Sequence, residues 1–389
     1  MNLKKILIIT LFFHIIINAT RPVITLAANS YDASLFEIGM ITALYALLPL
    51  FLSIYCGQLI DKFGDKIPSI FAYVLIIIGL IIPIFMSTIT GLVLSQLLLG
   101  FANVFIPISM QNLLGHESTE KNRDNFFSLF TLIIALGAVI GPIAGGYLTE
   151  YFSFEMVYIF CILCSLLGII GVLSLKIKNQ IHVKEKHSIL SSLQLLKNPQ
   201  IKVALFASAL VLYSKDIFIA YFPLLGHHLG LSEVKIGWII AIQGFAIMFI
   251  RFLLPKLLDW FSRKYILFIS ITVAGVSFIC IPLFENIYLL ALCTFLMGCG
   301  LGCGQPISMT ITYNASPIDR TAEVLGLRLT VNRLAQVIAP LAFGSLGGIL
   351  GIVSVFYLSS IFLITGSWIF RPSFSSLRMP NLKEKHPFK

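Results

Sequence analysis

Twelve long apolar stretches follow one another along the chain and are separated by short polar segments. Each stretch has the length that a helix needs to cross about 30 Å of hydrocarbon, which is about 20 residues. We expect every stretch to be helical because lipid cannot hydrogen-bond to open backbone groups. The predicted spans are 6–28, 38–57, 67–88, 91–113, 126–148, 154–175, 201–225, 234–254, 265–284, 288–312, 324–346 and 349–370. The pattern predicts an all-α polytopic membrane protein with twelve transmembrane helices.

The composition agrees with a lipid environment. Of the 389 residues, 58% are hydrophobic and only 11% are charged, and the mean hydropathy is +0.96. A soluble domain carries about a quarter charged residues, which keep its surface hydrated. This chain has too little polar material to cover a soluble globule of its size.

The net charge of +10 would suit a nucleic-acid-binding protein only if the basic residues formed a patch. With both termini in the cytoplasm, the 27 lysines and arginines gather at the inner face, with four exceptions: Arg21, Lys215 and Arg333 within spans, and Lys235 outside. The outer segments instead carry the acids Asp32, Glu37, Glu150, Glu155, Glu233 and Glu285. This positive-inside asymmetry predicts a multi-pass plasma (inner) membrane protein with both termini cytoplasmic and no nucleic-acid partner.

The N-terminus has one feature of a secretory signal, because Lys4 and Lys5 precede an apolar run. That run is longer than a typical signal core, and it ends in Arg21-Pro22 rather than at a small-residue cleavage site. We therefore expect it to be retained as the first span.

All seven cysteines lie within predicted spans. The pairs Cys161/Cys164 and Cys299/Cys303 have spacings that occur in metal sites. No histidine or carboxylate lies near them on the same helices, and cysteine packs between helices as a small apolar residue. We expect no metal site.

The chain repeats itself at an offset of 198 residues. The segment 35–41 resembles 233–239, with a shared glycine and isoleucines at matching places. Further matches at this offset are Leu59/Leu257, Asp61/Asp259, Lys66/Lys264, Gly100/Gly298 and Pro142/Pro340. The repeat predicts two related six-helix bundles, residues 1–175 and 201–372. A cytoplasmic linker (176–200) joins them, and a cytoplasmic tail (373–389) follows.

The segment between spans 2 and 3 has the pattern Gly-x-Leu-x-Asp-Lys-x-Gly-x-Lys, with Gly57, Asp61, Gly64 and Lys66 at its fixed positions. The glycines permit a tight cytoplasmic turn. Asp61 can bind basic groups or the N-terminus of a helix in the other bundle. The alternative is an ordinary short turn with solvated charges.

Span 5 contains a second pattern, Gly-x3-Gly-Pro-x2-Gly-Gly. Glycines four residues apart form a stripe that allows another helix to approach closely, and a proline removes a backbone donor and bends the helix. The residues are Gly137, Gly141, Pro142, Gly145 and Gly146. The alternative is a plain packing face.

These two patterns closely resemble signatures of the major facilitator superfamily, and the second resembles the signature of its drug:proton antiporters. The resemblance implies two pseudo-symmetric bundles, alternating access, monomeric function, and a role for Asp61 in latching the outward-open state. Asp65 departs from the first signature, which has a base there. Gln96 stands where the drug:proton family has an arginine four residues before Gly100, and the span-1 carboxylates of that family are missing. In the repeat copies, Pro255–Lys264 lacks both glycines, and residues 335–344 keep only Pro340 and Gly344.

Polar residues inside spans are costly and usually line a pathway. In the superfamily arrangement, spans 1, 4, 7 and 10 surround the central cavity. The predicted substrate or proton pathway consists of His14, Asn18, Arg21, Gln96, Asn103, Lys215, Asp216, Gln243, Gln305, Asn332, Arg333 and Gln336. The alternatives are structural: the amides and His14 as links between helices, Asp216 as a counter-ion of Arg21 or Lys215, and Arg328 extending to the cytoplasmic interface.

Three basic residues, Arg21, Lys215 and Arg333, lie within spans, against the single acid Asp216. This balance favours an anionic or zwitterionic solute over a lipophilic cation. Asp216 is the only membrane carboxylate, so we expect Asp216 and His14 to carry a coupling proton.

The sequence therefore predicts a secondary active transporter that moves a small organic solute outward, coupled to protons. The alternative is an uptake symporter or a facilitator for a small metabolite. No phosphate-binding loop is present, so we expect the proton gradient, and no cofactor, to supply the energy. An enzyme would need a catalytic constellation or a clustered metal site, and His227-His228 near Glu233 is only a faint suggestion of a metal site. A sensor or scaffold would be expected to add a soluble module, and no loop is long enough for one.

Overall fold

The computed structural model describes residues 2–118, 123–175, 195–316 and 321–371. Within these residues, twelve helices are long and apolar enough to cross a membrane, as predicted. The first six are α1 (Leu3–Ser30), α2 (Leu35–Phe63), α3 (Lys66–Phe85), α4 (Ile89–Glu117), α5 (Arg123–Tyr151) and α6 (Phe154–Leu173). The last six are α8 (Pro199–His228), α9 (Glu233–Trp260), α10 (Arg263–Cys280), α11 (Ile287–Ala315), α12 (Thr321–Leu350) and α13 (Ile352–Ser367). Short 3₁₀ turns η1 (Leu195–Lys197), η2 (Ile281–Leu283) and η4 (Trp368–Phe370) complete the order.

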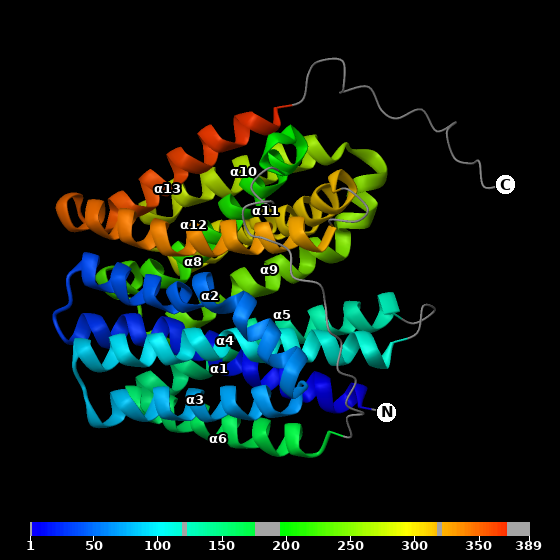
Figure 1. Ribbon diagram of the computed structural model, residues 1–389. Helices are drawn as coiled ribbons and strands as arrows, with labels where there is room; N and C mark the ends of the chain where they lie inside the picture. The colour runs from blue at the N-terminus through cyan, green and yellow to red at the C-terminus, as the bar shows by residue number, and fades with distance from the viewer. Residues whose placement is uncertain (1, 119–122, 176–194, 317–320, 372–389) are drawn as a thin grey trace.

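The helix boundaries follow the repeat found in the sequence. Helices α9, α11, α12 and α13 begin 198 residues after α2, α4, α5 and α6 (233 against 35, 287 against 89, 321 against 123, 352 against 154). Figure 1 shows α1–α6 as one bundle and α8–α13 as a second bundle beside it. The fold is therefore two pseudo-symmetric six-helix halves. Of the predicted linker and tail, residues 176–194 and 372–389 lie outside the described part of the chain.

The two faces of this helical assembly need names. We call the face at which α6 ends and α8 begins the linker face; α1 also begins and α13 also ends on this side (Figure 1). The other is the opposite face, where α2 and α9 begin. Both of these helices start at a serine: the Ser34 hydroxyl accepts a hydrogen bond from the Glu37 backbone N–H, and the Ser232 hydroxyl accepts one from that of Lys235. Such N-caps satisfy amides that a helix start leaves unpaired.

The glycine stripe of α5 explains how this helix packs against α1. A Cβ placed at Gly137 would lie 2.5 Å from the His14 Cβ, and one at Gly141 would lie 2.9 Å from the Asn18 Cβ. Gly145 approaches the Ala19 carbonyl in the same way, at 3.0 Å. All three distances are too short or nearly too short for a real side chain. The predicted stripe therefore exists, and it allows α5 to lie directly on α1.

Glycine and proline positions that repeat in the sequence meet across the boundary between the halves. A Cβ at Gly39 of α2 would lie 2.3 Å from the Pro340 carbonyl oxygen of α12, and one at Gly237 of α9 would lie 2.4 Å from that of Pro142 in α5. Gly39 and Gly237 are repeat partners, and so are Pro142 and Pro340. A second pair of symmetric contacts brings Gly344 against the Leu35 carbonyl and Gly146 against the Glu233 carbonyl. We call these four contacts the gate.

Two side chains add hydrogen bonds to the gate on the opposite face. The Tyr221 hydroxyl of α8 donates to the Pro340 carbonyl at 2.9 Å and lies 3.4 Å from the Leu35 carbonyl, so it joins the halves. The Glu150 carboxylate at the end of α5 accepts from the Val234 backbone N–H at 2.7 Å, in the first turn of α9. A carboxylate at a helix N-terminus interacts favourably with the helix dipole. In this structure the halves are joined closely on the opposite face.

The pattern between α2 and α3 is only partly the turn that we expected. Gly64 ends α2 with φ of 74°, a conformation that favours glycine. Gly57 instead lies inside α2, where a Cβ would meet nothing within 4 Å, so the expectation that it shapes the turn is wrong. Lys66 donates from its ammonium to the Leu173 carbonyl at the end of α6 (2.8 Å). The side chain of Asp61 lies outside the described residues, so its latch role stays a prediction.

The acid that departs from this pattern, Asp65, is buried. Its carboxylate accepts hydrogen bonds from the Asn112 amide of α4 at 3.1 Å to each oxygen. Asp65 therefore fastens the α2–α3 connection to its own half near the linker face.

Candidate functional site

The centre of the molecule contains a salt bridge between the two halves. The Arg21 Nη1 of α1 donates to the Asp216 Oδ1 of α8 at 2.7 Å. The side chains are 14% and 5% exposed, so the pair is largely shielded from solvent. Of the two counter-ion alternatives for Asp216, the structure has Arg21. Lys215 is its neighbour in sequence, but successive residues on a helix point about 100° apart and cannot share a direction.

The second oxygen of Asp216 continues the network into α12. The Gln336 Nε2 donates to Asp216 Oδ2 at 2.6 Å, and the Arg333 Nη1 donates to Gln336 Oε1 at 3.2 Å. The Tyr45 ring of α2 lies 5.1 Å from the Arg21 guanidinium carbon, within cation–π range. We call Arg21, Tyr45, Asp216, Arg333 and Gln336 the central network. Its two cations face one carboxylate, and Asp216 neutralises Arg21 directly but reaches Arg333 only through an amide.

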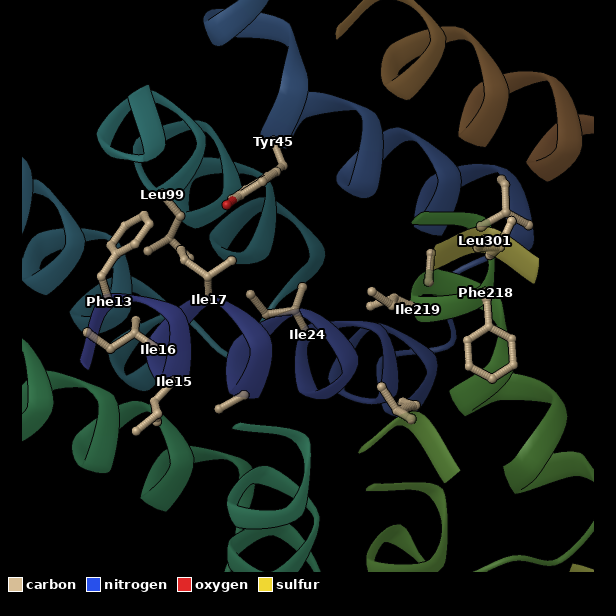
Figure 2. Close-up of a cluster of buried hydrophobic side chains, with 14 of the residues drawn as sticks. Phe13, Ile15, Ile16, Ile17, Ile24, Tyr45, Leu99, Phe218, Ile219 and Leu301 are labelled. Carbon is tan, nitrogen blue, oxygen red and sulfur yellow. The ribbon is translucent and has the colours of Figure 1, made fainter. Parts of the chain in front are cut away.

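A small pocket adjoins Arg21 on the side of the gate. Arg21 and Gln96 supply hydrogen-bond donors to it, and the Gln96 Nε2 is buried with no hydrogen-bond partner among the described residues. Figure 2 shows Ile24 of α1 and Ile219 of α8 on either side of the boundary between the halves, with Tyr45 nearby. The pocket is lined by Arg21, Ile24, Thr25, Ile41, Thr42, Gln96, Ile219 and Ala220. It combines donors for an oxyanion with an apolar wall.

Lys215, like Arg333, is a cation without a direct ionic partner among the described residues. It is partly buried and forms no hydrogen bond with any described residue, although it lies within electrostatic range of Asp216, Arg21 and Arg251. The sequence interpretation missed Arg251, because it lies near the end of its span and was assigned to the inner face. In the structure Arg251 is partly buried, and its Nε donates to the Gly302 carbonyl at 3.4 Å. The structure therefore places one more basic side chain within the helical halves than the sequence interpretation did.

His14 and Asn18 lie together on α1 but apart from the salt bridge. The Asn18 amide donates to the His14 carbonyl at 2.7 Å, and both residues pack against the glycines of α5. His14 is within electrostatic range of Lys215. These residues occupy the wall of the central region on the side of α5.

The remaining predicted pathway residues are not joined to the central network. Gln243 and Asn332 are buried, and neither the Gln243 Nε2 nor the Asn332 Oδ1 has a hydrogen-bond partner in the described part of the chain. Asn103 is partly buried and forms no hydrogen bond with the described residues. Gln305 binds Ser208 of α8 and Arg328 of α12 instead, in a separate cluster.

The alternative that Arg328 extends to the interface is wrong. Its side chain is only 7% exposed, and its Nη2 donates to the Gln305 carbonyl at 3.3 Å and to the Ser308 hydroxyl at 3.2 Å. Its position near the start of α12 would allow it to reach the interface. However, α11 offers polar groups closer by, and the helix rotation turns Arg328 toward them.

Comparison with known proteins agrees with this architecture. The model of the Major Facilitator Superfamily matches residues 6–260 and 204–387. An MFS-type transporter of Methanocaldococcus jannaschii is 26% identical over 88% of this chain and 90% of its own length. The multi-drug resistance efflux pump PmrA of Streptococcus pneumoniae is 24% identical over 84% of this chain and 83% of its own length. The multidrug resistance protein MdtG of Salmonella paratyphi A is 23% identical, covering 85% and 83%.

Solved structures share the fold. The nucleoside transporter NupG superposes with a TM-score of 0.76 at 16% identity, covering 95% of this chain and 98% of that one. A POT family transporter in complex with 5-aminolevulinic acid gives a TM-score of 0.78 at 16% identity, covering 94% of each. With the family match across nearly the whole chain, the twelve helices and the central network between two halves, this protein is a membrane transporter of the Major Facilitator Superfamily and not an enzyme.

Proposed function

We propose that this transporter exports a small zwitterionic organic solute by alternating access, in exchange for protons. The observation that carries the proposal is the salt bridge between Arg21 and Asp216 at the boundary of the halves. It places one carboxylate among several basic side chains, including Lys215 and Arg333. A site with both signs of charge suits a solute that has both.

The proposal includes an orientation. The linker face is the cytoplasmic one, because the basic residues gather there and follow the positive-inside pattern. The gate then closes the outer side in the described state. In alternating access the halves rock about the central site, so the gate opens when the linker face closes.

Zwitterion binding accounts for the exchange with protons. The ammonium group of the solute would replace Arg21 beside Asp216, and its carboxylate would bind the released Arg21 and Arg333. The ammonium group requires an ionised Asp216, whereas a proton neutralises it, so proton and solute exclude each other. Mutual exclusion at one site couples their movement in opposite directions. His14, near Lys215, is the second group to which we assign a coupling proton.

The outward direction is supported by the complete glycine pattern of α5 and by the relatives named as a multi-drug resistance efflux pump and a multidrug resistance protein. These relatives are distant, so they support export as a class of activity rather than a particular solute. The apolar wall of the pocket, formed by Ile24, Ile41 and Ile219, would accommodate a short aliphatic or ring portion of the solute.

A second candidate is uptake of an organic anion together with protons. The excess of basic groups favours it. A purely anionic solute would compete with Asp216 for Arg21, and protonation of Asp216 would remove that competitor. Proton and anion would then bind together and move in the same direction.

Proteoliposomes with an internal pH dye separate the two candidates. An outward gradient of a zwitterion such as glycine betaine, an anion such as benzoate, or a lipophilic cation is imposed, and proton movement is recorded. Proton entry driven by zwitterion exit supports export by exchange. Protons that leave with the anion support the second candidate, and solute movement without protons refutes both coupling proposals.

Asp216→Asn is expected to remove both zwitterion transport and the proton movement coupled to it, because the neutral amide can neither bind the ammonium group nor take up a proton. The matched control is Glu285→Gln, which removes an exposed carboxylate in the loop before α11. If Asp216→Asn retains full coupling, Asp216 is not the proton carrier, and His14 is tested next.

A further inference from the structure

A second polar cluster joins α8, α11 and α12 away from Asp216. The Arg328 Nη2 donates to the side-chain and main-chain oxygens of Gln305 and to the Ser308 hydroxyl. The Gln305 Nε2 donates to the Ser208 carbonyl at 2.9 Å, and the Ser208 hydroxyl lies 3.3 Å from Gln305 Oε1. We call these four residues the Arg328 cluster. They hold the guanidinium in one orientation.

Among the described residues, the charge of Arg328 has no counter-charge. Its side chain is 7% exposed, and every partner that it has among the described residues is neutral. A guanidinium has five N–H donors. Those used here belong to Nη2, and the buried Nε has no acceptor among the described residues. A buried cation that lacks both water and an anion is strongly destabilising, so natural proteins retain one chiefly where it has a task.

A buried apolar group lies nearer the linker face than the cluster does. Ile201, Leu205, Val324 and Leu327 are buried together on the same helices, α8 and α12, nearer the linker face. A low-dielectric surrounding strengthens the attraction between Arg328 and any anion that reaches it. The same side chains would have to move apart to admit one from the linker face.

The cluster lies between the central network and the linker face. Ser208 precedes Asp216 by eight residues on α8 (216 − 208), and Arg328 precedes Gln336 by eight on α12 (336 − 328). At a rise of about 1.5 Å per residue, both helices place the cluster about 12 Å from the Asp216–Gln336 contact. Both helices give the same distance, so the cluster is separate from the central network.

We propose that the Arg328 cluster is a second oxyanion subsite, which takes a single carboxylate or phosphate group on the route between the central network and the linker face. The proposal rests on the proposed function in that the transported solute carries an oxyanion group. The free Nε donor and the remaining Nη1 donors of Arg328 bind the oxygens of the carboxylate or phosphate group. The uncharged hydroxyls of Ser208 and Ser308 complete the subsite. Gln305 positions the guanidinium and does not itself supply charge.

The test measures binding without transport. Full-length protein in neutral detergent is unfolded thermally while inorganic phosphate replaces chloride at constant ionic strength, and the rise in Tm gives an apparent affinity. We compare wild type with Arg328→Gln and with Arg263→Gln, which removes an exposed arginine at the start of α10 instead. Hydrogen bonds to a charged group account for an expected loss of affinity of about tenfold to a hundredfold in Arg328→Gln. Arg263→Gln is expected to keep the wild-type phosphate response.

Each outcome decides the proposal. No saturable phosphate response in the wild type, an equal loss in both variants, or a loss confined to Arg263→Gln would overturn the subsite. Arg328→Lys keeps the charge if Arg328→Gln fails to fold, and its expected loss is smaller because the planar fork is missing. The same Tm measurement is repeated with phosphatidylglycerol in place of phosphate. If only the Tm rise with phosphatidylglycerol depends on Arg328, the oxyanion comes from a lipid headgroup.

The result is independent of the transport assay. Phosphate binding that depends on Arg328, in a protein that exchanges no zwitterion for protons, would refute the proposed function alone. Proton-coupled export in a protein whose phosphate response ignores Arg328 would refute the subsite alone.

Discussion

The salt bridge between Arg21 and Asp216 makes a quantitative prediction about stability. Asp216→Asn keeps the shape of the side chain but leaves the Arg21 cation buried without its anion. Arg21→Gln leaves the Asp216 carboxylate buried without its cation. The side chains are only 14% and 5% exposed, so water compensates little for the loss. Breaking one partner of a buried pair typically costs about 3–5 kcal/mol.

The double variant is expected to cost much less than the sum of the two single changes. Two neutral amides in place of the pair remove both charges at once, and such replacements are often nearly neutral for stability. We therefore expect a coupling energy of about 3 kcal/mol or more in the free energy of unfolding. The control cycle pairs Asp216→Asn with Arg333→Gln. Arg333 reaches Asp216 only through Gln336, so its coupling is expected to be below about 1 kcal/mol.

The assay is reversible unfolding in mixed micelles, with increasing denaturing detergent and the fluorescence of the three tryptophans as the signal. None of the tryptophans belongs to the central network. Additive single-variant effects, or equal coupling in the two cycles, would refute the view that Asp216 is held chiefly by Arg21.

Three further predictions concern the packing of the halves. Gly137→Val is expected to abolish transport and lower the folded yield because its side chain would overlap α1, whereas Gly57→Ala meets open space and leaves both unchanged; a tolerated Gly137→Val would contradict the close contact. Tyr221→Phe removes the hydroxyl that joins the halves, so we expect the closed gate to weaken by about 1 kcal/mol, or about fivefold. Thiol labelling of a cysteine placed in the gate measures this change, and unchanged labelling would argue against the gate. Glu150→Gln is expected to shift the same labelling in the same direction by a smaller factor, because an exposed carboxylate at a helix N-terminus is screened by water.

Much of the fold was predictable because lipid imposes a simple rule on sequence. A span must be apolar over its whole length, so hydropathy alone located all twelve helices. The offset of 198 residues predicted which helices correspond. The glycine stripe of α5 was also predictable, since residues four apart face the same way on any helix.

The partners of the polar residues were not predictable in the same way. Helical spacing gives the direction of a side chain around its own helix axis. It does not give the rotation, axial shift and crossing angle of the neighbouring helix, which decide what that side chain meets. Asp216 could have paired with either basic neighbour, and Arg328 could have extended to the interface.

The sequence by itself therefore determined the membrane class, the twelve spans, the duplication and the set of polar residues that lipid cannot accommodate at low cost. Only the tertiary structure decided that Arg21 pairs with Asp216, that Gln305 belongs with Arg328, and that repeated glycines and prolines meet across the gate. The physical reason is that burial in lipid acts on each helix separately, whereas a hydrogen bond or close contact depends on the placement of two helices to within about an ångström.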